Sequence, residues 1–167
     1  GLWGYLAVAV AACLMAGATV NGLFAFGAEY GWRGWLADEL SPLGSFWANL
    51  VVGILAGLSA APLVLLGHGY PGYPVLGVGF MLAWSVPTSF LLWRLRQWRG
   101  TLLAPAMLHG AVNGLVGVFW VVLAGGHPLL AAPMGLVGIA VITVLTGIFW
   151  LATAPSIRAA RAAADLA

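Results

Sequence analysis

The chain has 167 residues, of which 63% are hydrophobic and only 6% are charged, with a mean hydropathy of +1.05 and a formal net charge of +2. Water-soluble domains carry about 25% charged residues, so this composition excludes an ordinary soluble domain. It indicates an all-α fold, a polytopic transmembrane helical bundle surrounded by membrane lipid. The single Cys13 excludes a disulfide within this chain and a zinc site built from cysteines.

Five apolar segments predict five membrane spans, since a helix needs about 20 residues to cross a bilayer. No basic region precedes the first segment, so we expect a span there rather than a secretory signal peptide. No repeat or linker divides the chain, which predicts a single domain over residues 1–167. Between the second and third spans, Gly and Pro at 69–74 predict a turn-rich loop. The five spans are 2–26, 46–66, 75–93, 102–123 and 129–152.

The arginines predict how the bundle is oriented in its membrane. Three of them lie in a predicted loop over 94–99, and Arg158 and Arg161 follow the last span. Two crossings separate these groups, so both lie on one side, which the positive-inside rule assigns to the cytoplasm. We therefore expect a protein of the bacterial inner membrane, with a short surface helix over 156–167. Since the arginines act as topology signals, we expect no nucleic-acid partner.

Two pairs of polar side chains have the spacing of one helical turn. Glu29 and Arg33 are four residues apart, and so are His109 and Asn113. Ionisable groups at membrane depth are costly, which makes them functional candidates. An imidazole can orient water, and an amide can donate a hydrogen bond to the oxyanion formed when a peptide carbonyl is attacked. The alternatives are a structural ion pair and a polar contact that joins two helices.

The segments that contain these pairs resemble a known family. EYGWRGWL at 29–36 and LAPAMLHGAVN at 103–113 resemble the first and last motifs of the CPBP family, which comprises intramembrane proteases of the CAAX-protease and bacteriocin-processing type. These are related to type II CAAX prenyl endopeptidases. The resemblance covers about residues 21–116. It implies an intramembrane endopeptidase that hydrolyses a peptide bond in a membrane-associated protein or peptide, either prenylated or unmodified.

Four residues match the family pattern of Glu-Glu-x-x-x-Arg followed later by His-x-x-x-Asn. The second motif glutamate falls on Glu29 and its arginine on Arg33, while the last motif falls on His109 and Asn113. By resemblance, His109 and Asn113 stabilise the oxyanion, and Glu29 and Arg33 hold the motif helix in place.

Two further family positions are occupied by alanine. The first motif glutamate, which in the family activates the water, falls on Ala28. GLSAAPL at 57–63 resembles the family's Gly-Leu-Trp-His-Ala-Pro-Leu, which puts the middle histidine on Ala60 and an aromatic position on Ala56. We interpret Ala28 and Ala60 as the inactivation of a working protease. The alternative is a natural pseudoprotease that acts as a membrane scaffold, an immunity factor or a partner-binding protein.

The remaining histidines and hydroxyls define the other hypotheses. Two imidazoles and a carboxylate in an active parent could ligate zinc. This chain retains one of those imidazoles, so we expect no cofactor and no tightly bound metal. We expect His68 and His127 in loops at the opposite membrane face. A weaker resemblance, to rhomboid serine proteases, would pair Ser59 with His109, but Ser59 lacks the following glycine.

Overall fold

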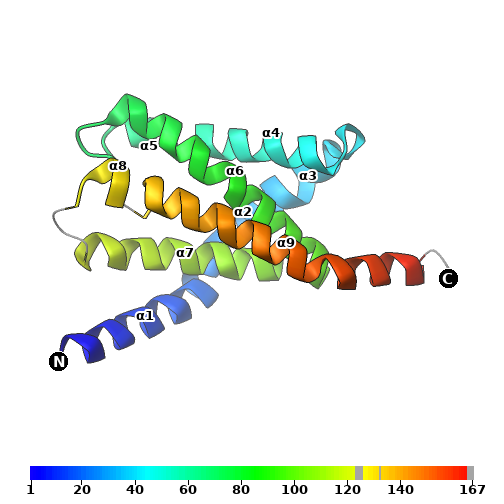
Figure 1. Ribbon diagram of the computed structural model, residues 1–167, viewed down its shortest axis with the longest axis horizontal. Coiled ribbons are helices and arrows are strands. Elements are labelled where there is room, and N and C mark those ends of the chain that lie inside the picture. The colour runs from blue at the N-terminus through cyan, green and yellow to red at the C-terminus, as the bar shows by residue number, and fades with distance from the viewer. Residues whose placement is uncertain (123–125, 132, 165–167) are drawn as a thin grey trace.

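The computed structural model describes residues 1–122, 126–131 and 133–164, and within these ranges it contains helices and no strand, which confirms the all-α prediction. Figure 1 shows α7 packed against α1, and α6 packed against both α4 and α9. The elements are α1 (Leu2–Ala18), α2 (Val20–Glu29), the π-helix η1 (Tyr30–Leu36), α3 (Ala37–Glu39), the 3-10 helix η2 (Ser41–Leu43), α4 (Ser45–Ser59), α5 (Ala61–Leu65), α6 (Pro74–Arg99), α7 (Leu103–Val122), α8 (Pro128–Ala131) and α9 (Leu136–Ala164).

The predicted apolar segments are helical, but they differ in length and continuity. In the described residues, α6 and α9 are each long and apolar enough to cross a membrane. A third span forms if Trp3–Ala18 and Val20–Glu39, which meet at a bend of 45°, are counted together. The apolar helices Ser45–Ser59 and Leu103–Val118 are shorter. The second predicted span is broken between α4 and α5, where Pro62 lacks the N–H that would continue the helix.

The predicted loop over 94–99 is wrong, because α6 continues to Arg99 and ends at Gly100, which has a φ of 68°. Glycine adopts this left-handed conformation readily and is the usual residue after a helix end. Arg94 is buried, and its Nε donates to Thr153 Oγ1 at 2.9 Å. Contact with α9 therefore keeps these last turns helical, although their charge suggested a loop.

The short surface helix expected over 156–167 is not a separate element. Helix α9 runs without interruption through Pro155 to Ala164, and residues 165–167 lie outside the described residues, as does residue 123 at the end of the fourth predicted span. Proline is tolerated inside membrane helices because neighbouring groups compensate for the lost hydrogen bond. The prediction of a turn-rich loop before Pro74 is confirmed, since α6 begins there.

Glycines allow α7 to approach the junction of α1 and α2 at backbone contact distance. A Cβ added to Gly110 would lie 2.5 Å from the backbone nitrogen of Gly22 and 2.6 Å from the carbonyl oxygen of Gly17. A Cβ on Gly17 would lie 2.2 Å from the Cα of Ala111. Small residues at helix crossings in membranes permit this kind of packing. The crossing brings His109 next to the end of α2.

A second glycine contact joins α4 to α6. A Cβ on Gly53 would lie 2.9 Å from the Cα of Val86, and one on Gly57 would lie 3.2 Å from the Cα of Leu82. Gly53 and Gly57 are four residues apart and face the same neighbour, the arrangement of a small-xxx-small helix contact. This contact fixes the position of Ala60, three residues further on.

We expect Gly110→Ala to destabilise the protein by about 1–3 kcal/mol, because the new methyl group meets backbone atoms that cannot move independently. Gly117→Ala in the same helix is the matched control, since a Cβ there meets nothing within 4 Å. It should be neutral, or stabilising by up to about 1 kcal/mol through helix propensity. Thermal melting in detergent measures both. Equal melting temperatures for the two variants would contradict the close crossing.

Candidate active site

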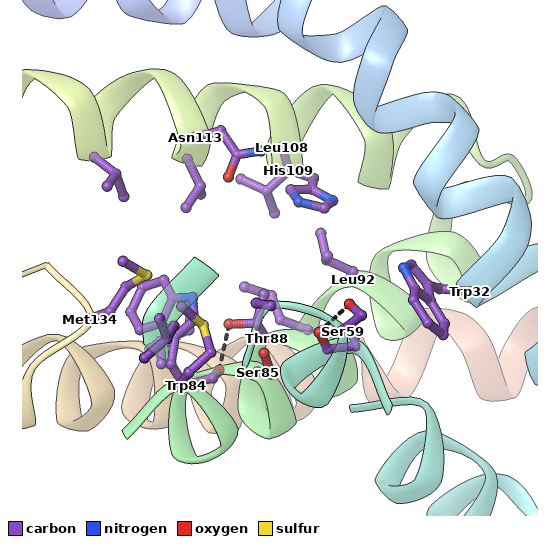
Figure 2. Close-up of a pocket in the computed structure, with 18 of the residues that line it drawn as sticks. Trp32, Ser59, Trp84, Ser85, Thr88, Leu92, Leu108, His109, Asn113 and Met134 are labelled. Atoms are coloured by element: carbon purple, nitrogen blue, oxygen red, sulfur yellow. Dashed lines mark hydrogen bonds between the residues drawn. The ribbon is translucent and has the colours of Figure 1, made fainter. Parts of the chain in front are cut away.

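A cavity of about 590 Å³ lies between α7 on one side and α4 and α6 on the other. Figure 2 shows His109 and Asn113 projecting from α7 across this space toward Ser59, Ser85 and Thr88. His109 and Asn113 share a helix face because they are four residues apart. The polar groups of the cavity therefore come from helices that are distant in sequence.

Glu29 links the first and last sequence motifs. It is the last residue of α2 and is fully buried. Its Oε1 atom lies 2.8 Å from Arg33 Nη1 and 2.7 Å from His109 Nδ1. An ionised carboxylate can only accept hydrogen bonds, so His109 donates from Nδ1, and in the neutral imidazole Nε2 is then the acceptor nitrogen. The carboxylate thus fixes one tautomer of the imidazole.

The Glu29 and Arg33 side chains are enclosed by protein. Arg33 is 3% exposed and Glu29 is 0% exposed. Among the described residues, Glu29 Oε2 and Arg33 Nε have no hydrogen-bond partner. The two charges therefore stabilise each other, and His109 adds a contact to Glu29. Either charge would be costly to leave unpaired in a low-dielectric interior.

The two alanine positions lie differently with respect to the cavity. Ala60, at the junction of α4 and α5, lines it, and so does Ala56 one turn earlier. Ala28 is half-buried on α2, next to Glu29 in the chain, and is not among the described residues that line the cavity. No aspartate or glutamate occurs among those lining residues. The cavity thus combines two imidazoles, of His68 and His109, with a guanidinium, an amide, hydroxyls and an apolar wall.

Helices that carry a glutamate–arginine turn and a His-x-x-x-Asn turn meet at this cavity. The family described as type II CAAX prenyl endopeptidase Rce1-like matches residues 2–115, a range that contains both turns and Ala60. The chain belongs to this family. No curated protein and no solved structure matches it. At the family level it is a CAAX-type intramembrane protease, and with its apolar helices it is an integral membrane protein.

A zinc site does not fit the side chains that this family member presents. Within the described ranges, no group of three or more His, Cys, Asp or Glu residues could hold a metal ion. A catalytic zinc normally has three protein ligands. Here His109 and Glu29 lie within contact distance of each other and could supply two ligands. The Glu29 oxygen that contacts His109 is already occupied by Arg33.

The serine-protease alternative finds limited support in the geometry. Ser59 and His109 line the same cavity of this CAAX-type fold, but Ser59 Oγ donates to the carbonyl oxygen of Ala56 at 2.7 Å. In the described part of the chain, the hydrogen bond of His109 goes to Glu29. A serine nucleophile needs an adjacent base within hydrogen-bond reach, and this arrangement does not supply one.

Sequence reasoning missed two residues of the cavity. His68 was expected in a loop away from the site, yet it lines the same cavity, and so does Trp32 of η1. Hydropathy gives no signal for this, because it reports depth and not which residues surround a shared space. His127 lies elsewhere and contacts Tyr73, with Nε2 3.2 Å from the tyrosine oxygen.

Proposed function

We propose that this chain binds a membrane-associated peptide or protein segment in the cavity of a CAAX-type endopeptidase without hydrolysing it. The alternative is a pseudoprotease that serves as a membrane scaffold or an immunity protein and uses another surface. The observation that carries the first proposal is the composition of the cavity wall. It keeps His109 and Asn113 but has alanine at position 60 and no carboxylate among its described lining residues.

The retained groups support recognition of a peptide carbonyl. The Asn113 side-chain amide can donate a hydrogen bond to a carbonyl oxygen that lies in the cavity. His109 Nε2, held in one orientation by the contact at Nδ1, can accept a hydrogen bond from a water or a peptide N–H. Apolar residues of α6 and α7 line the remainder and suit an apolar segment of the ligand.

The missing groups explain why hydrolysis should fail. Water is a weak nucleophile and needs a base within hydrogen-bond reach. Glu29 is buried and already accepts hydrogen bonds from Arg33 and His109. It is therefore poorly placed to act as the base that activates the water. His109 Nε2 can accept a hydrogen bond from a water. Ala60 has no group that could hold that water in place for attack. The parent chemistry is therefore expected to depend on a glutamate at position 28 and a histidine at position 60.

Binding can be tested with a lipidated CAAX-type peptide and with the same peptide unmodified, by photo-crosslinking in detergent. We expect Ala60→Trp to weaken crosslinking at least about tenfold, because the indole occupies space that the peptide needs. Ala140→Trp, at an exposed position of α9, is the matched control and should crosslink like the original chain. Equal crosslinking by both variants would favour the scaffold alternative, in which the cavity is not used.

The orientation in the membrane is part of the same proposal. The end of α6 is joined to α3 by a pair of hydrogen bonds from Arg96 to Asp38, each 2.9 Å. This contact supports placing both segments at one membrane face. With the positive-inside rule, we propose that this face is cytoplasmic and that the membrane is the bacterial inner membrane.

A further inference from the structure

The backbone between Glu29 and Arg33 has an unusual conformation. Residues Tyr30–Leu36 form the π-helix η1, a rare structure that occurs frequently at functional sites. Arg33 and Gly34 are its buried residues. Because π-helical turns are rarely stable by themselves, contacts from other elements must hold this one.

Arg96 of α6 supplies such a contact. Its Nη1 donates to the backbone carbonyl of Arg33, in the middle of η1. The same guanidinium donates to both carboxylate oxygens of Asp38, at 2.9 Å each. Asp38 lies on α3, directly after η1. Arg96 therefore contacts the π-helix itself and the turn that follows it.

A continuous series of contacts runs from Arg96 to the imidazole. Arg96 contacts the Arg33 carbonyl, the Arg33 side chain contacts Glu29 Oε1 at 2.8 Å, and Glu29 Oε1 contacts His109 Nδ1 at 2.7 Å. A guanidinium with a bidentate carboxylate partner has a defined direction, which a flexible ammonium group would lack. Movement of the Arg33 backbone would displace the carboxylate that fixes the His109 tautomer.

We propose that Arg96 is a positioning residue for His109, acting through the backbone of Arg33 and oriented by Asp38. The inference concerns the site of the proposed function and extends it to residues that the sequence suggested only as topology signals. Its consequence is that the far end of α6 controls which nitrogen of His109 carries the proton.

The test measures the His109 tautomer by ¹⁵N NMR in protein labelled only at histidine. Arg96→Ala should lower the ratio of the Nδ1–H to the Nε2–H tautomer of His109 by about tenfold, the size expected for one charge-assisted hydrogen bond. His68 and His127 serve as internal controls and should not change. Arg99→Ala is the matched arginine control, since Arg99 is exposed and lies over the ring of Trp98. It should leave all three histidines unchanged.

A charge swap separates positioning from simple ion pairing. In Asp38→Arg combined with Arg96→Asp the ion pair can re-form, but an aspartate at position 96 cannot donate to the Arg33 carbonyl. The His109 tautomer should stay shifted in this double variant. A return to the original ratio, or an unchanged ratio in folded Arg96→Ala, would overturn the proposal.

If Arg96→Ala does not fold, Arg96→Lys decides, because lysine can reach the carbonyl without the bidentate contact, and an intermediate tautomer ratio is expected. An original ratio in Arg96→Lys would overturn the role of orientation by Asp38. These measurements require no cleavage, so a shifted tautomer in a chain that binds no peptide would count against the proposed function alone.

Discussion

Placing Glu at position 28 and His at position 60 together should turn this chain into an active endopeptidase. The double variant Ala28→Glu with Ala60→His is expected to cleave a reconstituted membrane peptide about 10² to 10⁴-fold faster than the original chain. This is the usual contribution of a general base to the rate. Ala60 already lines the cavity, so an imidazole there would project into it. Ala28 is half-buried beside Glu29, and a glutamate would carry its carboxyl group beyond the alanine Cβ.

The single variants provide the control for this experiment. Groups that act as a unit fail together, so Ala28→Glu or Ala60→His alone should recover little activity. The assay should compare a lipidated CAAX-type peptide with its unmodified form. If the original chain cleaves as fast as the double variant, hydrolysis uses other groups. Ser59 and His109, which line the same cavity, would then be examined first.

Removal of Arg33 should have the largest effect on stability. Arg33→Ala is expected to cost about 3–5 kcal/mol, because it leaves the fully buried Glu29 without its cationic partner. The melting temperature in detergent should fall accordingly. Arg99→Ala, which removes an exposed arginine from α6, is the matched control and should melt like the original chain.

The paired replacement distinguishes a buried charge from lost packing. Glu29→Met with Arg33→Met removes both charges and keeps apolar side chains of similar length. Replacing both members of a buried ion pair is often neutral or stabilising, so this double variant should melt above Arg33→Ala. A double variant that melts below Arg33→Ala would show that the contact between Glu29 and His109, and not the ion pair, supplies the stability.

The family, the helical class and the spacing of the polar pairs could be predicted from the sequence. Hydropathy and composition depend only on local residue content, so they sufficed to predict an all-α membrane protein. The spacings of Glu29 with Arg33 and of His109 with Asn113 follow from helix periodicity. His109 and Asn113 both lie in α7, whereas Glu29 ends α2 and Arg33 lies in the π-helix η1 that follows it.

Element boundaries were harder to predict, because tertiary contacts compete with local signals. The arginines over 94–99 suggested a loop, yet burial of Arg94 against α9 keeps them in α6. The charged tail remains part of α9 through Pro155, where the sequence suggested a break. In both places packing between helices outweighed composition.

The sequence by itself determined which residues are present for chemistry, including the alanines at 28 and 60, and that the chain is built from apolar helices. Only the tertiary structure decided which of them share a space. The carboxylate of Glu29 contacts an imidazole 80 residues away, because glycines let α7 cross α2 at backbone distance. Close helix approach depends on three-dimensional shape, and a linear pattern of hydropathy or charge does not encode it.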